Sequence, residues 1–204
     1  MTKQVAELAW NSRDLPAYFA VTKIGEAGTR WPRIDEFSFF GAVLAVNHQS
    51  RTPYLHRNSN RLTSQEETTL ILRSIGMTAL QVEHNLGISQ ATINTHLKRA
   101  YRKLNGNNDC TITTASALSL AYGIISIVEP LPDTDARLPE YCNPILQAIA
   151  EGKTNEEIVT ATALPFEEVK KSIPEMYKYL GLPGREALTL YGYLSGSINL
   201  LDVY

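Results

Sequence analysis

The chain has 204 residues, of which 44% are hydrophobic and 20% charged, and its formal net charge is −2. This composition is typical of a globular protein with one or two domains, long enough to bury a core without disulfides or metal ions. The two cysteines, Cys110 and Cys142, have no metal-binding spacing, so we expect free thiols in a reducing compartment. The N-terminus lacks a signal-peptide pattern, and the longest apolar stretch, 37–46, is too short to span a bilayer. We therefore predict a cytoplasmic protein that has no contact with membranes.

Charge is distributed unevenly along the chain. Residues 1–61 carry eight Lys and Arg against five Asp and Glu, residues 62–129 carry five of each, and residues 130–204 carry six against eleven. A basic N-terminal part and an acidic C-terminal part predict different partners at the two ends of the chain.

The first 61 residues are predicted to form a helical N-terminal extension. Residues 2–10 and 34–48 are interpreted as helices, and 27–33 as a loop between them. Residues 48–61 form a polar, basic connector whose arginines can add contacts to phosphates.

Residues 62–104 are predicted to form three helices. Thr63 and Glu66 have the capping-box spacing, in which a hydroxyl and a carboxylate each satisfy a backbone N–H that the helix leaves unbonded. Thr78 is expected to cap a second helix that ends at Gly87, and Ser89 a third. A fourth helix is predicted over 115–128 because an apolar run there ends before Pro130. Residues 130–137, rich in proline and aspartate, are the predicted linker between domains 62–129 and 138–204.

The third helix has one apolar and one basic face. Its apolar residues are spaced 4, 3 and 4 apart, which is one face of a helix: Ile93, Leu97, Ala100 and Leu104. Positions 91, 94, 95, 98 and 102 then point outward. The segment 87–104 has four cations and no acid: Lys98, Arg99, Arg102 and Lys103. A short helix, a turn and a longer basic helix form the helix-turn-helix plan.

This segment closely resembles the LuxR/GerE-type (NarL-like) helix-turn-helix family over residues 62–104. Sigma-factor region 4 shares much of the pattern, but the sequence around His96 fits LuxR/GerE better. The following residues carry the match: Leu62-Thr63, Glu66, Leu70, Gly76, Val82, Leu86-Gly87-Ile88-Ser89, Thr92-Ile93, His96-Leu97 and Arg102-Lys103-Leu104.

The resemblance implies a four-helix domain whose third helix reads duplex DNA and whose fourth helix makes a dimer contact. It places Asn94, Thr95 and Lys98 in the major groove and Thr92 against a phosphate. The outward positions agree: Lys98, Arg99 and Arg102 suit phosphates, and Asn94 can pair with a base edge. Ala79 and Leu80 depart from the family, which tends to have polar residues where the second helix starts. The competing interpretation of the basic stripe is a solvated helix face, and for His96 we favour a structural role.

Residues 138–180 repeat the pattern of residues 62–104 at a shift of 76 residues without a gap, and a fourth helix at 185–198 matches that of the first domain after a shorter loop. Leu62 falls on Leu138, and the Gly-x-Thr turn at Gly76 falls on Gly152. We interpret this as an internal duplication with a degenerate second copy. Glu168 replaces Thr92, and Pro174 replaces Lys98, so we expect the copy to lose its DNA contacts and its helix to kink or break at the proline. The copy could act as a built-in pseudo-partner, offer an acidic surface to another protein, or be a decayed duplicate retained for stability.

The sequence as a whole predicts an all-α protein with two tandem four-helix domains. The predicted function is a bacterial DNA-binding transcriptional regulator that reads duplex DNA through its first domain. RNA polymerase or another regulator is the expected protein partner of the acidic C-terminal domain, and a homodimer is an open alternative. The competing function is an adaptor or anti-activator that binds a LuxR-type regulator or polymerase in place of DNA. No catalytic motif, cofactor motif or metal-ligand spacing is present, so we expect neither an enzyme nor a cofactor.

Overall fold

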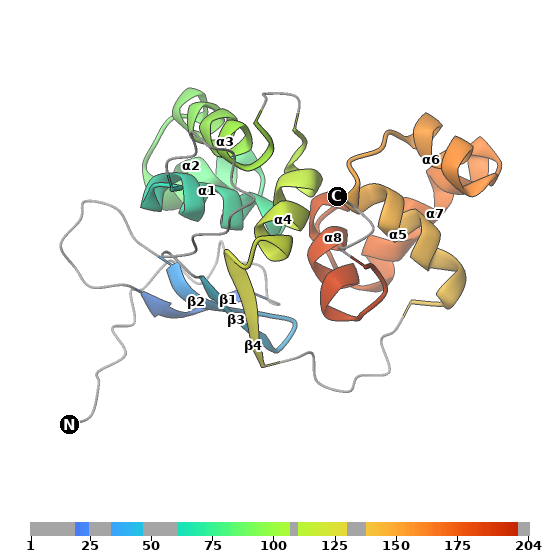
Figure 1. Cartoon of the computed structure of the whole chain (residues 1–204), viewed down its shortest axis with the longest axis horizontal. Coiled ribbons are helices and arrows are strands. Elements are labelled where there is room, and N and C mark those ends of the chain that lie inside the picture. Colours follow the sequence, from blue (N-terminus) through green and yellow to red (C-terminus); the bar gives the residue numbers. More distant parts are fainter. Residues whose placement is uncertain (1–18, 25–33, 47–60, 107–109, 130–137, 200–204) are drawn as a thin grey trace.

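The protein is described here from a computed structural model, in which residues 19–24, 34–46, 61–106, 110–129 and 138–199 are described. Two sets of helices lie side by side, and a small antiparallel sheet lies beneath the first set (Figure 1). The helix predicted at 2–10, most of the basic connector 48–61 and the linker 130–137 lie outside the described residues.

The sheet shows that the predicted all-α fold is wrong. It has four antiparallel strands in the order β1 (Phe19–Ile24), β2 (Ile34–Phe39), β3 (Ala42–Val46) and β4 (Ile125–Glu129). The first three strands follow one another in the chain, but β4 comes from the far end of the first helical set and pairs with β3. The sheet therefore ties the N-terminal segment to the helices.

The expected helix at 34–48 is a β-hairpin because its apolar residues alternate. Phe37, Phe39 and Leu44 are fully buried, while Ser38 and Val43, which alternate with them, are half-buried. Phe40 and Gly41 form the turn, with φ values of 55° and 85°. Two successive left-handed residues match the twist of a two-residue hairpin, and this turn closes the pairing of Phe39 with Ala42.

The first helical set, which we call the first unit, comprises α1 (Ser64–Ser74), α2 (Ala79–Leu86), α3 (Gln90–Asn105) and α4 (Ile112–Ala121). The predicted capping box of Thr63 and Glu66 is confirmed, and Thr78 forms a second capping box with Gln81. The predicted fourth helix is wrong in its second half, since α4 ends at Ala121. The chain then enters β4, where Ile125 pairs with Val46.

The second helical set, the second unit, comprises a short 3-10 helix η1 (Glu140–Cys142), α5 (Asn143–Ala150), α6 (Asn155–Thr162), α7 (Phe166–Tyr179) and α8 (Arg185–Leu194). Of the predicted kink or break at Pro174, the break is wrong, because α7 runs on through the proline, and the kink stays a prediction. The proline leaves the carbonyl of Lys170 without its helical donor, but Lys170 is exposed, so water can satisfy that oxygen.

The two units pack against each other through α4 and α8. In addition, α8 contacts α1 of the first unit, and α4 contacts α5 of the second unit. At this interface between the units, which we call the seam, one glycine from each unit lies closely against the other unit. A methyl group on Gly76 would overlap the ring of Pro183, and one on Gly152 would overlap the hydroxyl of Thr114. Buried side chains of both units and the sheet form one continuous core.

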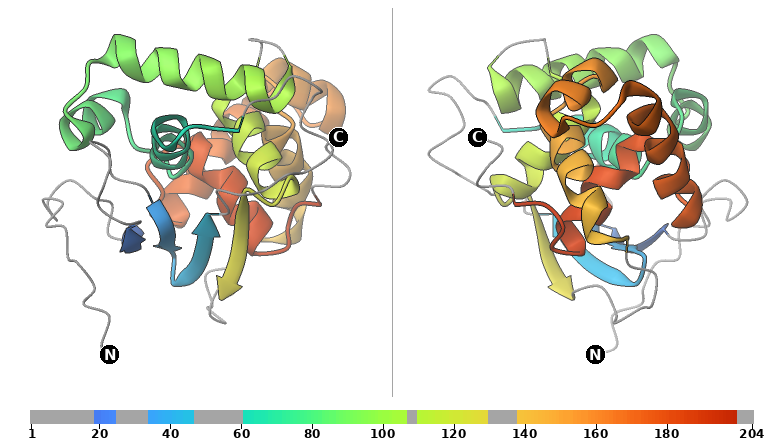
Figure 2. Two further views of the ribbon diagram at one scale, coloured as in Figure 1. Left: turned by 60° about the vertical axis from the view of Figure 1, so that its left-hand side comes forward. Right: turned by 90° about the vertical axis from the view of Figure 1, so that its right-hand side faces the viewer.

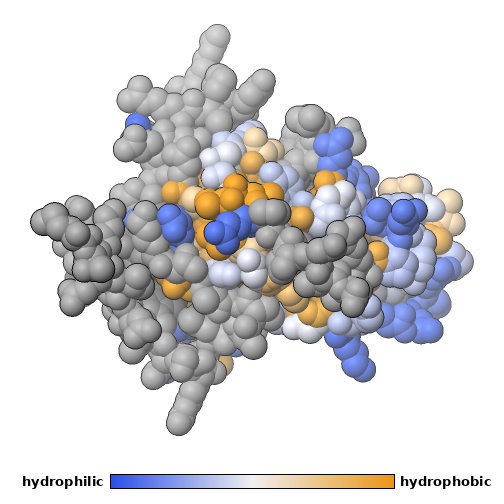
Figure 3. Space-filling view, turned by 90° about the horizontal axis from the view of Figure 1, so that it is seen from below, coloured by the Kyte–Doolittle hydropathy of each residue, from blue (hydrophilic) through white to orange (hydrophobic). Residues whose placement is uncertain are grey.

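The surfaces on the two sides of the molecule differ. The long helix α3 lies along the side opposite the sheet (Figure 2). Viewed from the sheet side, hydrophobic residues gather toward the middle of the described surface, and hydrophilic ones toward the end formed by the second unit (Figure 3). The basic helix is therefore presented away from the sheet.

Candidate nucleic-acid interface

The turn between α2 and α3 is fixed by two residues whose roles the sequence predicts. Gly87 ends α2 in the left-handed conformation, with φ of 63°, and its N–H donates to the carbonyl of Glu83. Ser89 then caps α3, because its hydroxyl accepts from the backbone N–H of Thr92 at 3.3 Å. The short turn sets the direction in which α3 leaves α2.

The inward face of α3 agrees with the predicted spacing. The four apolar positions are all buried in the core: Ile93, Leu97, Ala100 and Leu104. Burial of these side chains fixes the rotation of the helix about its axis, because turning it would bring apolar groups into water. The opposite positions therefore face solvent.

All six predicted DNA-contact residues are on α3. Five are exposed and one, Thr92, is half-buried: Asn94, Thr95, Lys98, Arg99 and Arg102 are the exposed ones. The three cations among them share this helix with no acidic residue. A surface with that charge and those amide and hydroxyl groups is chemically suited to a polyanion.

The fourth cation of the stripe, Lys103, has a structural role that the sequence analysis missed. Its Nζ donates to Glu66 Oε2 at 2.6 Å and to the carbonyl of Arg61 at 2.9 Å. The Glu66 side chain is only 3% exposed and also accepts from the N–H of Thr63 at 2.7 Å. Lys103 thus neutralises a buried carboxylate that belongs to the capping box of α1.

Two hydroxyls on the exposed face are already engaged. Thr95 Oγ1 donates to the carbonyl of Ala91 at 2.8 Å, so this oxygen is left to accept a further hydrogen bond. The hydroxyl of Thr92 lies 3.0 Å from that of Ser89. Asn94 is exposed and offers both an amide donor and a carbonyl acceptor.

An acidic side chain lies beside the start of α3. Gln90 Nε2 donates to Glu83 Oε2 of α2 at 3.0 Å, a contact that spacing within one helix could not reveal. Nearby on α2, Leu80 is 65% exposed, where the resemblance leads us to expect a polar residue. The start of α2 therefore adds no positive charge to the face of α3.

His96 is buried between α1 and α3, as expected for a structural histidine. It is 7% exposed, and burial lowers its pKa, although the Glu66 carboxylate acts in the opposite direction and Arg99 lowers it further. Its position below the exposed face separates it from the six predicted contact residues.

The third α-helix of the second unit, α7, presents different charges from α3. Glu167 and Glu168 are in its first turn, both exposed. Lys171 Nζ lies 3.7 Å from Glu175 Oε1, a surface ion pair one helical turn apart. The face of α7 thus carries charges of both signs.

The described residues show neither a metal-binding cluster nor a membrane-spanning helix. Their acidic, histidine and cysteine side chains form no cluster of three or more that could hold a metal ion. None of the helices described is both long and apolar enough to cross a membrane. Both cysteines are free, as predicted, and burial raises the pKa of Cys110 to about 12.

Comparisons with curated proteins and with solved structures found no match to this chain. Residues 60–116 match the family model GerE, described as "Bacterial regulatory proteins, luxR family". The matched range takes in α1, α2, α3 and the start of α4, and no second copy is shown in the second unit. The match supports, for this part of the chain, a helix-turn-helix DNA-binding transcription regulator in general, from a family that is not typically enzymatic.

Proposed function

We propose that the chain is a transcriptional regulator that reads duplex DNA with α3 of the first unit. The observation that carries this proposal is the face of α3 that points away from the core. It presents Lys98, Arg99 and Arg102 with no acid on the helix, while the remaining cation, Lys103, is held by Glu66. A helix of this width fits the major groove of B-DNA.

Each residue of this face has a proposed part. Lys98, Arg99 and Arg102 bind phosphates, which supply most of the affinity and fix the register. Asn94 pairs with a base edge, because its amide can donate and accept together. Thr92 and Thr95 add hydrogen bonds, Thr92 to a phosphate.

The test is duplex binding by the full chain over a salt series, with the double variant Lys98→Ala/Arg102→Ala. Loss of two phosphate contacts should lower the slope of log K against log salt by roughly 2 and remove most of the affinity. The matched control is Lys170→Ala/Lys171→Ala, which removes two exposed cations from α7 and should leave binding unchanged. Unaltered affinity in the α3 double variant would refute the assignment of α3 to the groove.

The second unit is proposed to be a degenerate copy of the first that acts as its built-in partner. The bounds of α2 and α6 agree at the shift of 76 residues, and the glycine contacts at Gly76 and Gly152 are reciprocal. Because α8 covers a face of α4, we expect the chain to be monomeric in sedimentation experiments and to bind a single half-site. A stable homodimer would argue against this role.

The alternative function is an adaptor that binds a LuxR-type regulator or polymerase in place of DNA. Four exposed carboxylates in the first turns of α6 and α7 favour it: Glu156, Glu157, Glu167 and Glu168. Absence of any duplex binding by the full chain at low salt would favour the adaptor, since the basic face of α3 would then have another partner.

A further inference from the structure

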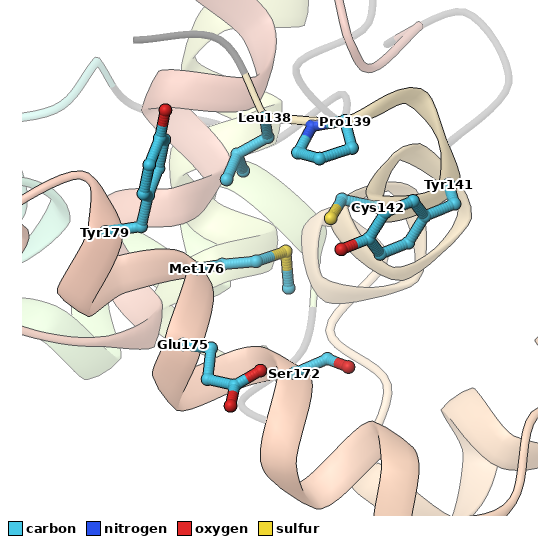
Figure 4. A pocket seen from close by; sticks show the side chains of 8 residues that line it. All are labelled: Leu138, Pro139, Tyr141, Cys142, Ser172, Glu175, Met176 and Tyr179. Carbon is cyan, nitrogen blue, oxygen red and sulfur yellow. The ribbon is translucent and has the colours of Figure 1, made fainter.

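A pocket of about 290 Å³ opens in the second unit, between the chain around η1 and the C-terminal half of α7 (Figure 4). Met176 and Cys142 line its interior and are almost fully buried. Tyr141 and Tyr179 lie on opposite sides, and Leu138 lies between them. The pocket is therefore lined by two segments that are far apart in the sequence of the second unit but close together in space.

In the first unit an ion pair occupies the equivalent positions. At the shift of 76 residues, Cys142 takes the place of Glu66 and Tyr179 the place of Lys103, which are ion-paired across α1 and α3. There α1 packs closely on α3, whereas α5 and α7 scarcely touch. The start of the second unit is also altered, since η1 replaces the first turn of an α-helix and Pro139 provides no side-chain cap. The residues that line the pocket therefore differ in chemistry from those at the equivalent positions of the first unit.

The lining has a specific chemistry. Tyr141 and Tyr179 are 70% and 62% exposed, so most of each side chain is open to contact with a ligand. Along α7, Ser172 and Glu175 supply a hydroxyl and a carboxylate at one side of the pocket (Figure 4). Glu175 pairs with Lys171 at 3.7 Å, but both side chains are mostly exposed, so a ligand cation could displace this weak pair.

We propose that this pocket binds a small aromatic molecule that carries a protonated amine. The aromatic body would lie on Met176 between the tyrosine rings, where sulfur–aromatic and ring–ring contacts are favourable. The ammonium group would lie at Glu175, whose carboxylate supplies the negative charge at this side of the pocket. The volume is near the lower end of small-molecule sites, which suits a small ligand, and the carboxylate disfavours anions.

The experiment uses the full chain with its methionine methyl groups labelled for NMR. The probe is 2-phenylethylamine, and 2-phenylethanol is its neutral match. The Met176 methyl signal should shift and saturate with a dissociation constant on the order of a millimolar, as expected for so small a ligand. Met77, fully buried in the first unit, is the internal reference and should not shift.

Selectivity distinguishes an amine site from a merely apolar hollow. The amine should bind about threefold to fivefold more tightly than the alcohol, the effect of one exposed carboxylate. Glu175→Gln should abolish this preference, while Glu168→Gln, an exposed acid of α7 outside the pocket, should preserve it. Tyr179→Ala should weaken both probes about fivefold. An unmoved Met176 signal, equal binding of amine and alcohol, or a preference that survives Glu175→Gln would each overturn the proposal. None of these outcomes depends on DNA binding.

Discussion

Each of the two units described has four α-helices, and the third helices of the two units present different side chains. Ile93 of α3 and Val169 of α7 are both fully buried, and the residues one turn later, Leu97 and Ile173, are buried as well. The exposed faces differ, since all the charged residues of α3 are basic, whereas α7 has two glutamates in its first turn. The comparison teaches that the buried positions determine the fold of each unit, whereas a few exposed positions determine what it can bind.

The largest effect should come from the polar pair that only the first unit has. Lys103→Ala leaves the Glu66 carboxylate buried with the N–H of Thr63 as its remaining donor. We expect a loss of about 2–3 kcal/mol in the free energy of unfolding, measured by urea denaturation. The counterpart Tyr179→Ala should cost little, because that ring is 62% exposed. Similar losses in the two variants would mean that the units are stabilised alike at this position.

The seam between the units gives the next largest effect. Gly152 has φ of 80°, and a methyl group there would overlap the hydroxyls of Thr111 and Thr114. Gly152→Ala should destabilise the chain by about 2 kcal/mol or more, since the left-handed backbone alone costs roughly 1–2 kcal/mol. Gly181→Ala is the control, because Gly181 has φ of 67° with open space around it and should show the backbone cost alone. Equal losses in the two variants would remove the evidence for a close seam.

Local features of the helices could be predicted from the sequence, and contacts between distant segments could not. The caps Thr63, Thr78 and Ser89 are confirmed because capping depends on residues within one turn. The all-α prediction failed at 34–46, where strict alternation around Phe37 and Phe39 was outweighed by the length of the apolar run. That hairpin also needs β4, which lies some eighty residues further along the chain.

The same distinction between local features and long-range contacts holds for the candidate site. Periodicity predicted which residues of α3 are buried and which are exposed, and the structure agrees. It did not separate Lys103 from the other cations, because the partner Glu66 lies 37 residues away. The pocket beside α7 was also missed, since its lining joins residues around η1 to residues of α7 more than thirty positions later in the chain.

The ends of α2 and α6 allow a reciprocal test of smaller size. Both helices end in a left-handed residue, Gly87 with φ of 63° and Ala163 with φ of 56°. Alanine is strained in this conformation and glycine is not. Gly87→Ala should therefore destabilise the chain by about 1 kcal/mol, and Ala163→Gly should stabilise it by up to about the same amount. Thermal denaturation of the two variants measures both, and changes of the same sign would contradict a shared backbone plan.

The smallest effect concerns His96, which the second unit replaces with Ser172. Burial holds the pKa of His96 below its ordinary value of 6.5, so the unfolded chain binds a proton more readily than the folded chain. This contribution to stability is fully present above pH 6.5 and is lost as the pH falls toward the pKa of the folded state. The midpoint of thermal unfolding should therefore decrease between pH 7 and pH 5, and His96→Gln should make that decrease shallower. His84→Gln, on the exposed part of α2, should leave it as it is. If the decrease is the same with and without His96, its burial does not distinguish the first unit from the second in this pH range.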